Sequence, residues 1–464
     1  MFRAMEVAVA QVARGFADKV VEAILQEMVA DKAFQSECSA AARAGAEFKM
    51  RDVGRRSVEV TLLGGRKTTV RVTYLRPDYR GRPGRRRGNG RRGKGGSGTY
   101  PALAALGIWF GVTPALADEI SRQVTDSDSV RAGRTALARR DIDLGHKQTL
   151  RIVNGFGRRA VEQRDDWIEK VLKEPGPMNG TLRGKRVISA IDGGRIRERA
   201  PLGGRPSSTT GHHRYEAPWR EPKLFCIYVV SRDGNIEDSF RPVYDGTMKN
   251  CDGAFELLSG YLKALGVHEA KALILLGDGA PWIWDRVAPL VETIGIPMKR
   301  VHQVVDWYHA VETLEDVAKA RRTWPEGDRE RWMRRAKKAL HAGDIPRLMT
   351  IFDEIALGRR AKAVNKHRNY FVKNAHRMTY ADFKAAKIPI GSGCVESAVR
   401  RIINMRMKGN GSFWLIENAE AMILLRSYLK AGRFDDLVDW STTTAAAWWR
   451  PSNHSDAAPV QKAA

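Results

Sequence analysis

The chain has 464 residues, 43% of them hydrophobic, which is enough for roughly two to four domains with at least one sizeable core. Lys and Arg number 79 against 53 Asp and Glu, and the resulting net charge of +26 favours a polyanionic partner, nucleic acid before an anionic membrane. The sequence has no bilayer-length apolar run, no signal-peptide core and no CxxC pair among its four cysteines, which argues against membrane-spanning, secreted disulfide-rich and zinc-knuckle proteins.

Residues 1–75 are expected to form an N-terminal helical segment followed by a β-hairpin. The segments Ser57–Leu62 and Thr68–Tyr74 alternate polar and apolar residues around a Gly64-Gly65 turn, as hairpin strands do. In the helical part, apolar residues recur with the period of one helix face. These are Val20, Val21, Ile24, Leu25 and Met28.

Residues 76–98 are dominated by Arg, Gly and Pro, which predicts a flexible basic linker. Its Arg85, Arg86 and Arg87 are candidate contacts to DNA phosphates. A solubilising spacer is the alternative interpretation.

Residues 99–180 contain three short helical patterns rich in arginine. The first starts at Pro114, the second is expected to be capped by Asp126 or Ser127, and the third by Asp143, running to about Gln163. A compact basic three-helix unit suits a helix-turn-helix DNA reader, although a plain helical subdomain has the same pattern.

Residues 181–310 change to the pattern of an α/β domain. The expected strands are Lys185–Ile191, Lys223–Val230, Glu237–Val243, Lys271–Leu276 and Met298–Val305, and the expected helices are Phe255–Leu265 and a short one from Pro281. Three strands, a helix, a strand, a helix and a strand match the order of a ribonuclease-H-like mixed sheet. We therefore predict an α/β fold whose core begins here.

The rest of the chain is expected to be mainly helical. Residues 311–390 are highly charged and predict an all-helical insertion into the α/β core. Residues 391–435 would supply the final helices of the core, and residues 436–464 a largely disordered tail.

Two aspartates end apolar strands in the same way, Asp192 in ISAIDGG and Asp278 in LILLGDGA. Catalytic groups of α/β sheets collect beyond the carboxyl ends of strands. Either aspartate alone is more often a turn residue or a helix cap. Two of them, with a third carboxylate nearby, would suit hard divalent metals, which bind oxygen ligands.

The segment Gly391–Trp414 offers that third carboxylate, Glu396. At the spacing of one helix face, Glu396 is followed by Arg400, Asn404 and Lys408, with Arg401 beside them. The opposite face is apolar and comprises Val395, Ala398, Val399, Ile402 and Met405. Taken alone, the polar stripe could be a solvated helix face with an ordinary salt bridge.

Asp306 and His309 stand one turn apart at the start of a predicted helix. Asp306 could cap this helix while His309 is half-buried, or the pair could act at a catalytic site. Their spacing does not match a zinc motif.

Four motifs together resemble bacterial insertion-sequence transposases of the ISKra family, which are DDE enzymes distantly related to the Mutator-like group. They are IDGGRIRER, GDGAPWIWDR, VDWYHAVETL and GSGCVESAVRRIINMRMKGNGSFW. The resemblance runs from about Ala102 to Leu425 and implies a ribonuclease-H-like catalytic domain. It implies Asp192, Asp278 and Glu396 as a triad binding two Mg²⁺ or Mn²⁺ ions, and Asp306 with His309 as the (C/D)xxH pair of related transposases.

On this interpretation the chain cuts element ends and joins them to target DNA, as a cytoplasmic, nucleoid-associated homo-oligomer. Double-stranded DNA, as terminal repeats and as target, is the expected partner. Candidate backbone contacts are Arg195, Arg197, Arg199, Arg400, Arg401, Arg406, Asn404 and Lys408. Two alternatives stay open: a catalytically silent DNA-binding derivative, and a ribonuclease-H-like nuclease without strand transfer.

Overall fold

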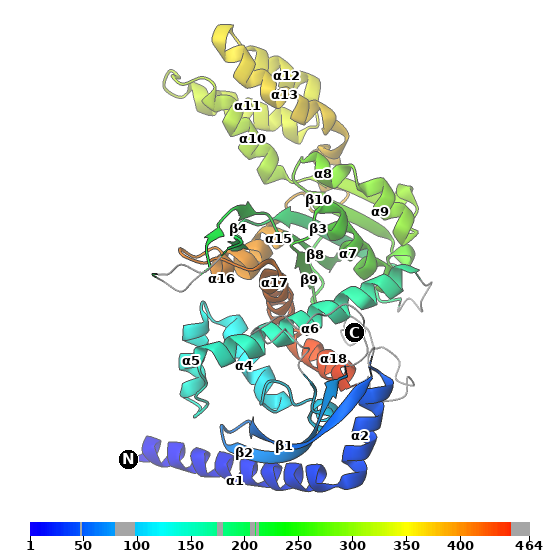
Figure 1. Ribbon diagram of the computed structural model, residues 1–464. Coiled ribbons are helices and arrows are strands. Elements are labelled where there is room, and N and C mark those ends of the chain that lie inside the picture. Colours follow the sequence, from blue (N-terminus) through cyan, green and yellow to red (C-terminus); the bar gives the residue numbers. More distant parts are fainter. Residues whose placement is uncertain (47–48, 79–97, 174–179, 205–208, 210–212, 447–464) are drawn as a thin grey trace. The chain divides into compact units, whose positions relative to one another are not determined.

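The computed structural model describes residues 1–46, 49–78, 98–173, 180–204, 209 and 213–446 (Figure 1). The chain divides into two compact units, one formed by Met1–Gln163 with the segment that begins at Arg433, the other by Arg164–Gly432. The basic segment with Arg85, Arg86 and Arg87 lies outside the described residues. Within the described ranges, none of the helices combines the length and apolarity needed to cross a bilayer.

The first unit is built around a long β-hairpin. Its elements are α1 (Phe2–Ala30), α2 (Lys32–Ala44), β1 (Met50–Thr61), β2 (Lys67–Pro77), α3 (Pro101–Ala105), α4 (Pro114–Asp126), α5 (Val130–Ala138), the start of α6 (His146–Lys173) and α18 (Phe434–Ala446). Val60 and Val70 of the hairpin are fully buried and share a core with Leu25 and Val29 of α1. Buried Asp18 of α1 accepts hydrogen bonds from the backbone of the hairpin turn, at Gly64 and Arg66. The hairpin expectation is confirmed, and its turn is fixed to α1.

The helix expected from the apolar stripe is present as α1, although Leu25 is the only member of the stripe that is buried. Two local expectations for this unit are wrong. Helix α5 is capped by Ser129, whose hydroxyl accepts from the Ala132 amide at 3.1 Å, and not by Asp126 or Ser127. The expected tail starts too early, because residues 436–446 belong to α18, in which Phe434 and Leu437 are buried; residues 447–464 lie outside the described residues.

The second unit contains a five-stranded mixed sheet of order β11-β10-β3-β8-β9. Its strands are β3 (Arg186–Gly193), β8 (Lys223–Val230), β9 (Val243–Thr247), β10 (Ala272–Gly277) and β11 (Val301–Val305). β10 and β11 run parallel to β3, whereas β8 is antiparallel to β3 and β9 to β8. The expected mixed α/β sheet is therefore present.

The third expected strand, Glu237–Val243, is wrong, since β9 begins only at Val243. Its Asp245-Gly246 pair has the composition of a turn, yet Asp245 is fully buried. The Arg164 guanidinium donates to Asp245 at 3.3 Å, and the Tyr261 hydroxyl donates to it at 2.9 Å. Because the burial of Asp245 depends on an arginine 81 positions away, the sequence around β9 does not indicate a strand.

Helices cover both faces of this sheet. The helices that follow the sheet strands are α7 (Cys251–Ala264), α8 (Pro281–Trp284), α9 (Val287–Ile294), α10 (Trp307–Lys319), α11 (Asp328–His341), α12 (Ile345–Asp353), α13 (Ala361–Lys373), α14 (Tyr380–Ala385), α15 (Gly393–Ala398), α16 (Met405–Met407) and α17 (Ile416–Lys430). On β9, Asp245 bonds Tyr261 of α7, while the neighbouring Tyr244 hydroxyl lies 4.0 Å from Cys394 Sγ of α15. Because adjacent residues of a strand point to opposite faces, α7 and α15 lie on opposite sides of the sheet. Helices α10 to α13 lie together in Figure 1.

Candidate active site at the strand ends

Three aspartates end three neighbouring parallel strands. Asp192 lies near the end of β3, Asp278 follows β10, and Asp306 follows β11. Leu276 of β10 pairs with Ala190 on one side and Val304 on the other, so each aspartate lies two residues beyond the same row. Neighbouring strands are about 4.8 Å apart. The sheet thus brings all three aspartates to one edge.

Asp306 is fully buried and holds two elements together. One carboxylate oxygen accepts from the His309 amide at 2.8 Å and caps α10, as expected for a helix cap. The other accepts from the Ser392 amide, in the loop that leads to α15. Asp306 therefore fixes the start of α10 against the segment that carries Glu396.

Glu396 and His309 lie beside this aspartate. The Ser392 hydroxyl donates to Glu396 Oε1 at 3.2 Å, and His309 Nδ1 lies 3.4 Å from Glu312 Oε2. One potential ligand atom from each of Asp306, His309 and Glu396 lies within 4.8 Å of the other two. This group could hold a metal ion.

The expected triad and this compact group share Glu396 and differ in their other members. Asp306 uses both oxygens in backbone hydrogen bonds. Asp192 accepts from the Gly193 amide through Oδ1, and Asp278 accepts from the Ala280 amide through Oδ1. Among the described residues, the structure records a hydrogen bond to only one oxygen of Asp192 and of Asp278, so these two carboxylates are the more available oxygen donors.

The electrostatics of Asp192 show how close these groups are. Burial raises the pKa of its carboxyl, opposed by the Gly193 amide and by His309, and the negative charges of Asp278 and Glu396 raise this pKa further. Carboxylates that repel one another favour a bound cation, which would lower the same pKa. Oxygen donors in a set of this charge fit Mg²⁺ or Mn²⁺.

An open cavity of about 370 Å³ adjoins Asp278. Its lining combines the turn after β10 with one side of α10 and a tyrosine from α13. The lining residues are Asp278, Gly279, Ala280, Pro281, His309, Glu312, Thr313, Asp316 and Tyr370. Asp278 and His309 thus border the same open cavity.

The α13 helix is fixed to this turn by two side chains that the sequence did not single out. The Tyr370 ring packs so closely on Gly279 that a Cβ there would lie 2.0 Å from its edge. Asn374 Nδ2 lies 3.4 Å from the Gly279 carbonyl oxygen. A tyrosine or asparagine on a charged helix has no local signal for such a role, although the glycine after Asp278 points to a close neighbour.

The helix that carries Glu396 changes its winding directly after α15. Residues Val399–Asn404 form a π-helix, which has a wider turn than an α-helix. Val395, Ala398, Val399 and Ile402 are buried as expected, but Met405 is 58% exposed and Arg406 and Met407 are buried instead. The extra residue per turn rotates the later positions, so the expected apolar face is wrong at Met405.

The expected DNA-contacting residues have different surroundings. Arg195, Arg197, Arg199, Arg400 and Lys408 are exposed, whereas Arg401 and Asn404 are half-buried. Arg406 is buried, with its guanidinium 5.4 Å from the centroid of the Trp414 ring, and so is unsuited to phosphate contact. Within this helix, Arg400 and Lys408 are the accessible cations.

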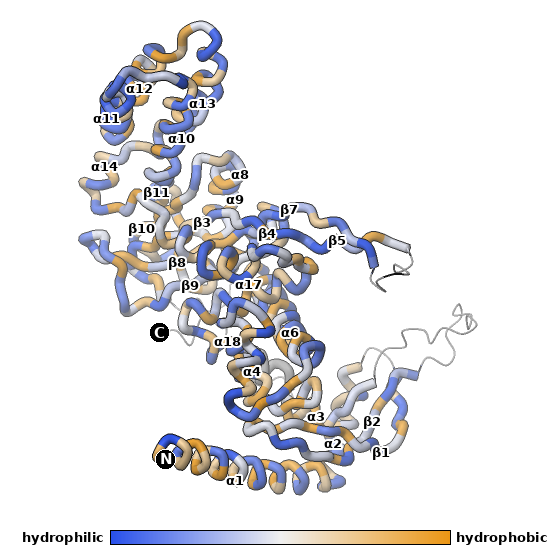
Figure 2. Tube along the Cα trace, turned by 90° about the vertical axis from the view of Figure 1, so that its left-hand side faces the viewer, coloured by the Kyte–Doolittle hydropathy of each residue, from blue (hydrophilic) through white to orange (hydrophobic). Residues whose placement is uncertain are grey.

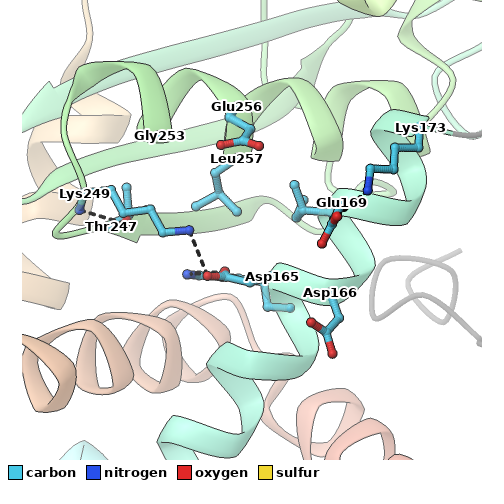
Figure 3. Close-up of a pocket in the computed structure, with 11 residues that line it drawn as sticks. Asp165, Asp166, Glu169, Lys173, Thr247, Lys249, Gly253, Glu256 and Leu257 are labelled. Carbon is cyan, nitrogen blue, oxygen red and sulfur yellow. Dashed lines mark hydrogen bonds and ion pairs between the residues drawn. The ribbon is translucent and has the colours of Figure 1, made fainter.

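A second cavity, of about 330 Å³, lies between the end of α6 and the start of α7 (Figure 3). Lys249 Nζ bonds Asp165 Oδ2 at 2.8 Å across it, and Lys173 pairs with Glu169. These lysines are thus neutralised by carboxylates, and none of the expected site residues lines this cavity.

Comparison with known proteins found no matching family model and no matching curated protein. Among solved structures, a Drosophila P element transposase strand transfer complex aligns with 68% of this chain and 80% of its own, at 10% identity and a TM-score of 0.21. A TM-score of this size does not establish a shared fold.

Proposed function

We propose that this chain is a bacterial insertion-sequence transposase that cuts element ends and joins them to target DNA by metal-dependent phosphoryl transfer. The observation that carries the proposal is the row of Asp192, Asp278 and Asp306 at one sheet edge, with Glu396 and His309 beside it. The negative charges of Asp278 and Glu396 raise the pKa of Asp192, which supports a site that binds cations.

The topology supports the same proposal. Numbered along the chain, the five sheet strands have the order 3-2-1-4-5, in which strand 2 runs antiparallel to strands 1 and 3, and strands 4 and 5 run parallel to strand 1. This is the arrangement expected of a ribonuclease-H-like core, and Glu396 follows it after the α10–α14 helices.

Asp192, Asp278 and Glu396 would hold two Mg²⁺ or Mn²⁺ ions, which when bound neutralise phosphate charge and hold the attacking and leaving oxygens of the displacement. The protein's own groups provide the positioning. Asp306 fixes the loop at Ser392, and Ser392 orients Glu396 through its hydroxyl.

His309 lies at the edge of the cavity next to Asp278, where its imidazole N–H can donate a hydrogen bond to a phosphate oxygen. Arg195, Arg197, Arg400 and Lys408 would neutralise backbone phosphates on the way to the site. Element ends and target are double-stranded DNA, and a homo-oligomer would bring two ends together.

The test is an assay of cleavage and joining on labelled DNA carrying the element ends, with Mg²⁺, Mn²⁺ or EDTA. We expect activity only with metal. Asp192→Asn, Asp278→Asn and Glu396→Gln should each abolish both steps, because each removes a negative ligand without changing side-chain size. Asp233→Asn, in an exposed turn of the same unit, is the matched control and should stay active.

Full activity in folded triad variants would refute the triad. Cleavage without joining would identify a nuclease. DNA binding with neither step, in the presence of metal, would identify a catalytically silent derivative.

A further inference from the structure

A β-ribbon leaves the sheet directly after Asp192 and returns at Lys223. It consists of two short antiparallel pairs, β4 (Ile196–Arg197) with β7 (Trp219–Arg220), and β5 (Ala200–Pro201) with β6 (Tyr215–Glu216). Figure 2 shows it projecting from the sheet. Its first residues are therefore continuous with the strand that carries a candidate metal ligand.

One face of the ribbon combines arginines with aromatic rings. Arg195, Arg197 and Arg199 alternate along the outgoing strand and so point to the same side. Trp219 lies directly opposite Arg197, and Tyr215 shares its face because the two are four residues apart on the returning strand. All five side chains belong to exposed residues. We name this set the Arg-aromatic face.

The arginines of this face lie over the rings. Arg197 and Arg195 have their guanidinium carbons 4.9 and 5.2 Å from the Trp219 ring centroid, and Arg199 lies 4.7 Å from that of Tyr215. The structure records no ion pair between these three arginines and a carboxylate within its described residues. Their positive charge is thus available to an outside partner.

The opposite face fixes the ribbon to the protein. Ile196 is fully buried, and Glu198 pairs with Arg220 across the two strands. The Trp414 amide also donates to the Arg197 carbonyl at 2.9 Å, and the Trp414 carbonyl accepts from the Arg199 amide at 2.8 Å. The Arg-aromatic face is therefore presented on a supported platform.

The two aromatic residues of this face are exposed. Trp219 is 45% exposed and Tyr215 39% exposed. Phe413, from the loop after α16, extends the row with its ring 5.5 Å from Tyr215. Exposed aromatic rings beside unpaired arginines form the combination that stacks bases and contacts phosphates of an unpaired strand.

We propose that the Arg-aromatic face binds unpaired bases of the DNA strand that enters the carboxylate site. The proposal rests on the proposed function for the identity of the nucleic acid. In a duplex the bases are stacked on one another, so only an opened or frayed end can occupy Trp219 and Tyr215. The ribbon would thus hold a melted end next to Asp192.

The experiment measures binding without catalysis. Fluorescence anisotropy in EDTA compares the full-length chain on a labelled single strand, its blunt duplex and the same duplex with an unpaired end. Trp219→Ala combined with Tyr215→Ala should weaken binding to the single strand and to the unpaired end by about tenfold or more, since stacking contributes ~1–3 kcal/mol per base. Binding to the blunt duplex should not change.

The matched control is Trp219→Phe with Tyr215→Phe, which keeps two stacking surfaces and should keep the preference for unpaired ends. Arg197→Ala should weaken binding to all three DNAs and reduce its salt dependence, whereas Arg232→Ala, in a turn outside the ribbon, should not. Photocross-linking with 5-iodouracil at the unpaired end should label Trp219 or Tyr215.

Equal losses on all three DNAs would reduce the ribbon to a general charge patch and overturn the proposal. No loss in the double alanine variant would overturn it as well. Either result leaves the metal-dependent cleavage test unaffected, and strand binding by a chain that cleaves nothing would refute the proposed function alone.

Discussion

Asp306 illustrates how one buried side chain can organise an active site without being its best ligand. It is fully buried, caps α10 by accepting from the His309 amide, and also accepts from the Ser392 amide. The side-chain hydroxyl of Ser392 in turn donates to Glu396. We regard it as a positioning residue. Its contribution should therefore be visible in stability as well as in activity.

Replacement of Asp306 by Ala should lower the free energy of unfolding by about 1–3 kcal/mol, because it leaves two backbone amides without their acceptor. Urea denaturation followed by circular dichroism measures the change. Asp306→Asn, which keeps one acceptor oxygen, should lie between Ala and wild type. A fully stable Ala variant would contradict the anchoring role.

A second buried aspartate gives a prediction on pH. Burial raises the pKa of Asp245 to about 6 from its usual 3.8, although Arg164, the Gly246 amide and Tyr261 oppose this rise. The folded state thus binds this proton more tightly than the unfolded state. Its stabilising contribution is full below pH 3.8 and is lost as the pH rises through about 6.

Asp245→Asn should therefore flatten the fall in unfolding free energy between about pH 4 and pH 6. The measurement is the difference in urea-unfolding free energy between wild type and variant across that range. The variant has no proton to lose at this position, so the difference isolates Asp245 from other carboxyls. Parallel curves would show that Asp245 titrates alike in both states.

At the scale of elements, helix α13 reaches the site through the close contact of Tyr370 with the turn after β10. The Tyr370 ring occupies the space where a Cβ of Gly279 would lie. Gly279→Ala should push Tyr370 away, destabilise the protein by about 1–3 kcal/mol and reduce cleavage. Thermal unfolding and the cleavage assay measure both effects.

The matched test is the double variant Gly279→Ala with Tyr370→Ala. Removing the ring should relieve the clash, so the two changes should cost less together than the sum of their separate effects. Additive losses would mean that Gly279 matters for a reason other than Tyr370.

The sequence predicted elements well where the pattern is local and poorly where it depends on distant partners. The apolar run Lys223–Val230 predicts β8 with its observed bounds, because a fully buried strand is apolar throughout. The position of β9 is not predicted, because the burial of Asp245 depends on Arg164. The pattern places Met405 on the wrong face, because no residue pattern indicates the π-helix before it.

The candidate site divides in the same way. Asp192 and Asp278 could be found from the ends of apolar strands, and Asp306 from its position before a helix. Ser392 and Tyr370 act through contacts with residues far away in the chain, so they could be found only in the structure. The assignment of the metal triad stays a prediction, as does the helix-turn-helix role of α4 to α6.

At the scale of the whole molecule, α1 carries an apolar stripe that none of the described residues covers. Figure 2 shows apolar and polar residues alternating along this helix. Its exposed apolar residues recur at alternating spacings of three and four, as in a coiled-coil seam. They are Phe2, Met5, Val9, Val12 and Phe16, each at least 55% exposed. A second copy of the same helix would complete this seam.

We therefore expect the chain to self-associate through α1. Val9→Glu with Val12→Glu should shift it to the monomer, since paired charges would face each other in the seam. Size-exclusion chromatography with light scattering measures the mass. Val7→Glu, which is off the stripe, is the control, and a wild type that is monomeric would refute the seam.

Gly193 and Gly194, which join Asp192 to the Arg-aromatic face, are closely packed against the side chains of Glu221 and Ile403. A Cβ at Gly193 would lie 2.2 Å from Glu221 Oε1, and one at Gly194 would lie 2.7 Å from Ile403 Cδ1. If the face holds an unpaired base, the protein fixes the distance from that base to the carboxylates. The cut would then fall a constant number of nucleotides from the melted end, whatever bases lie between.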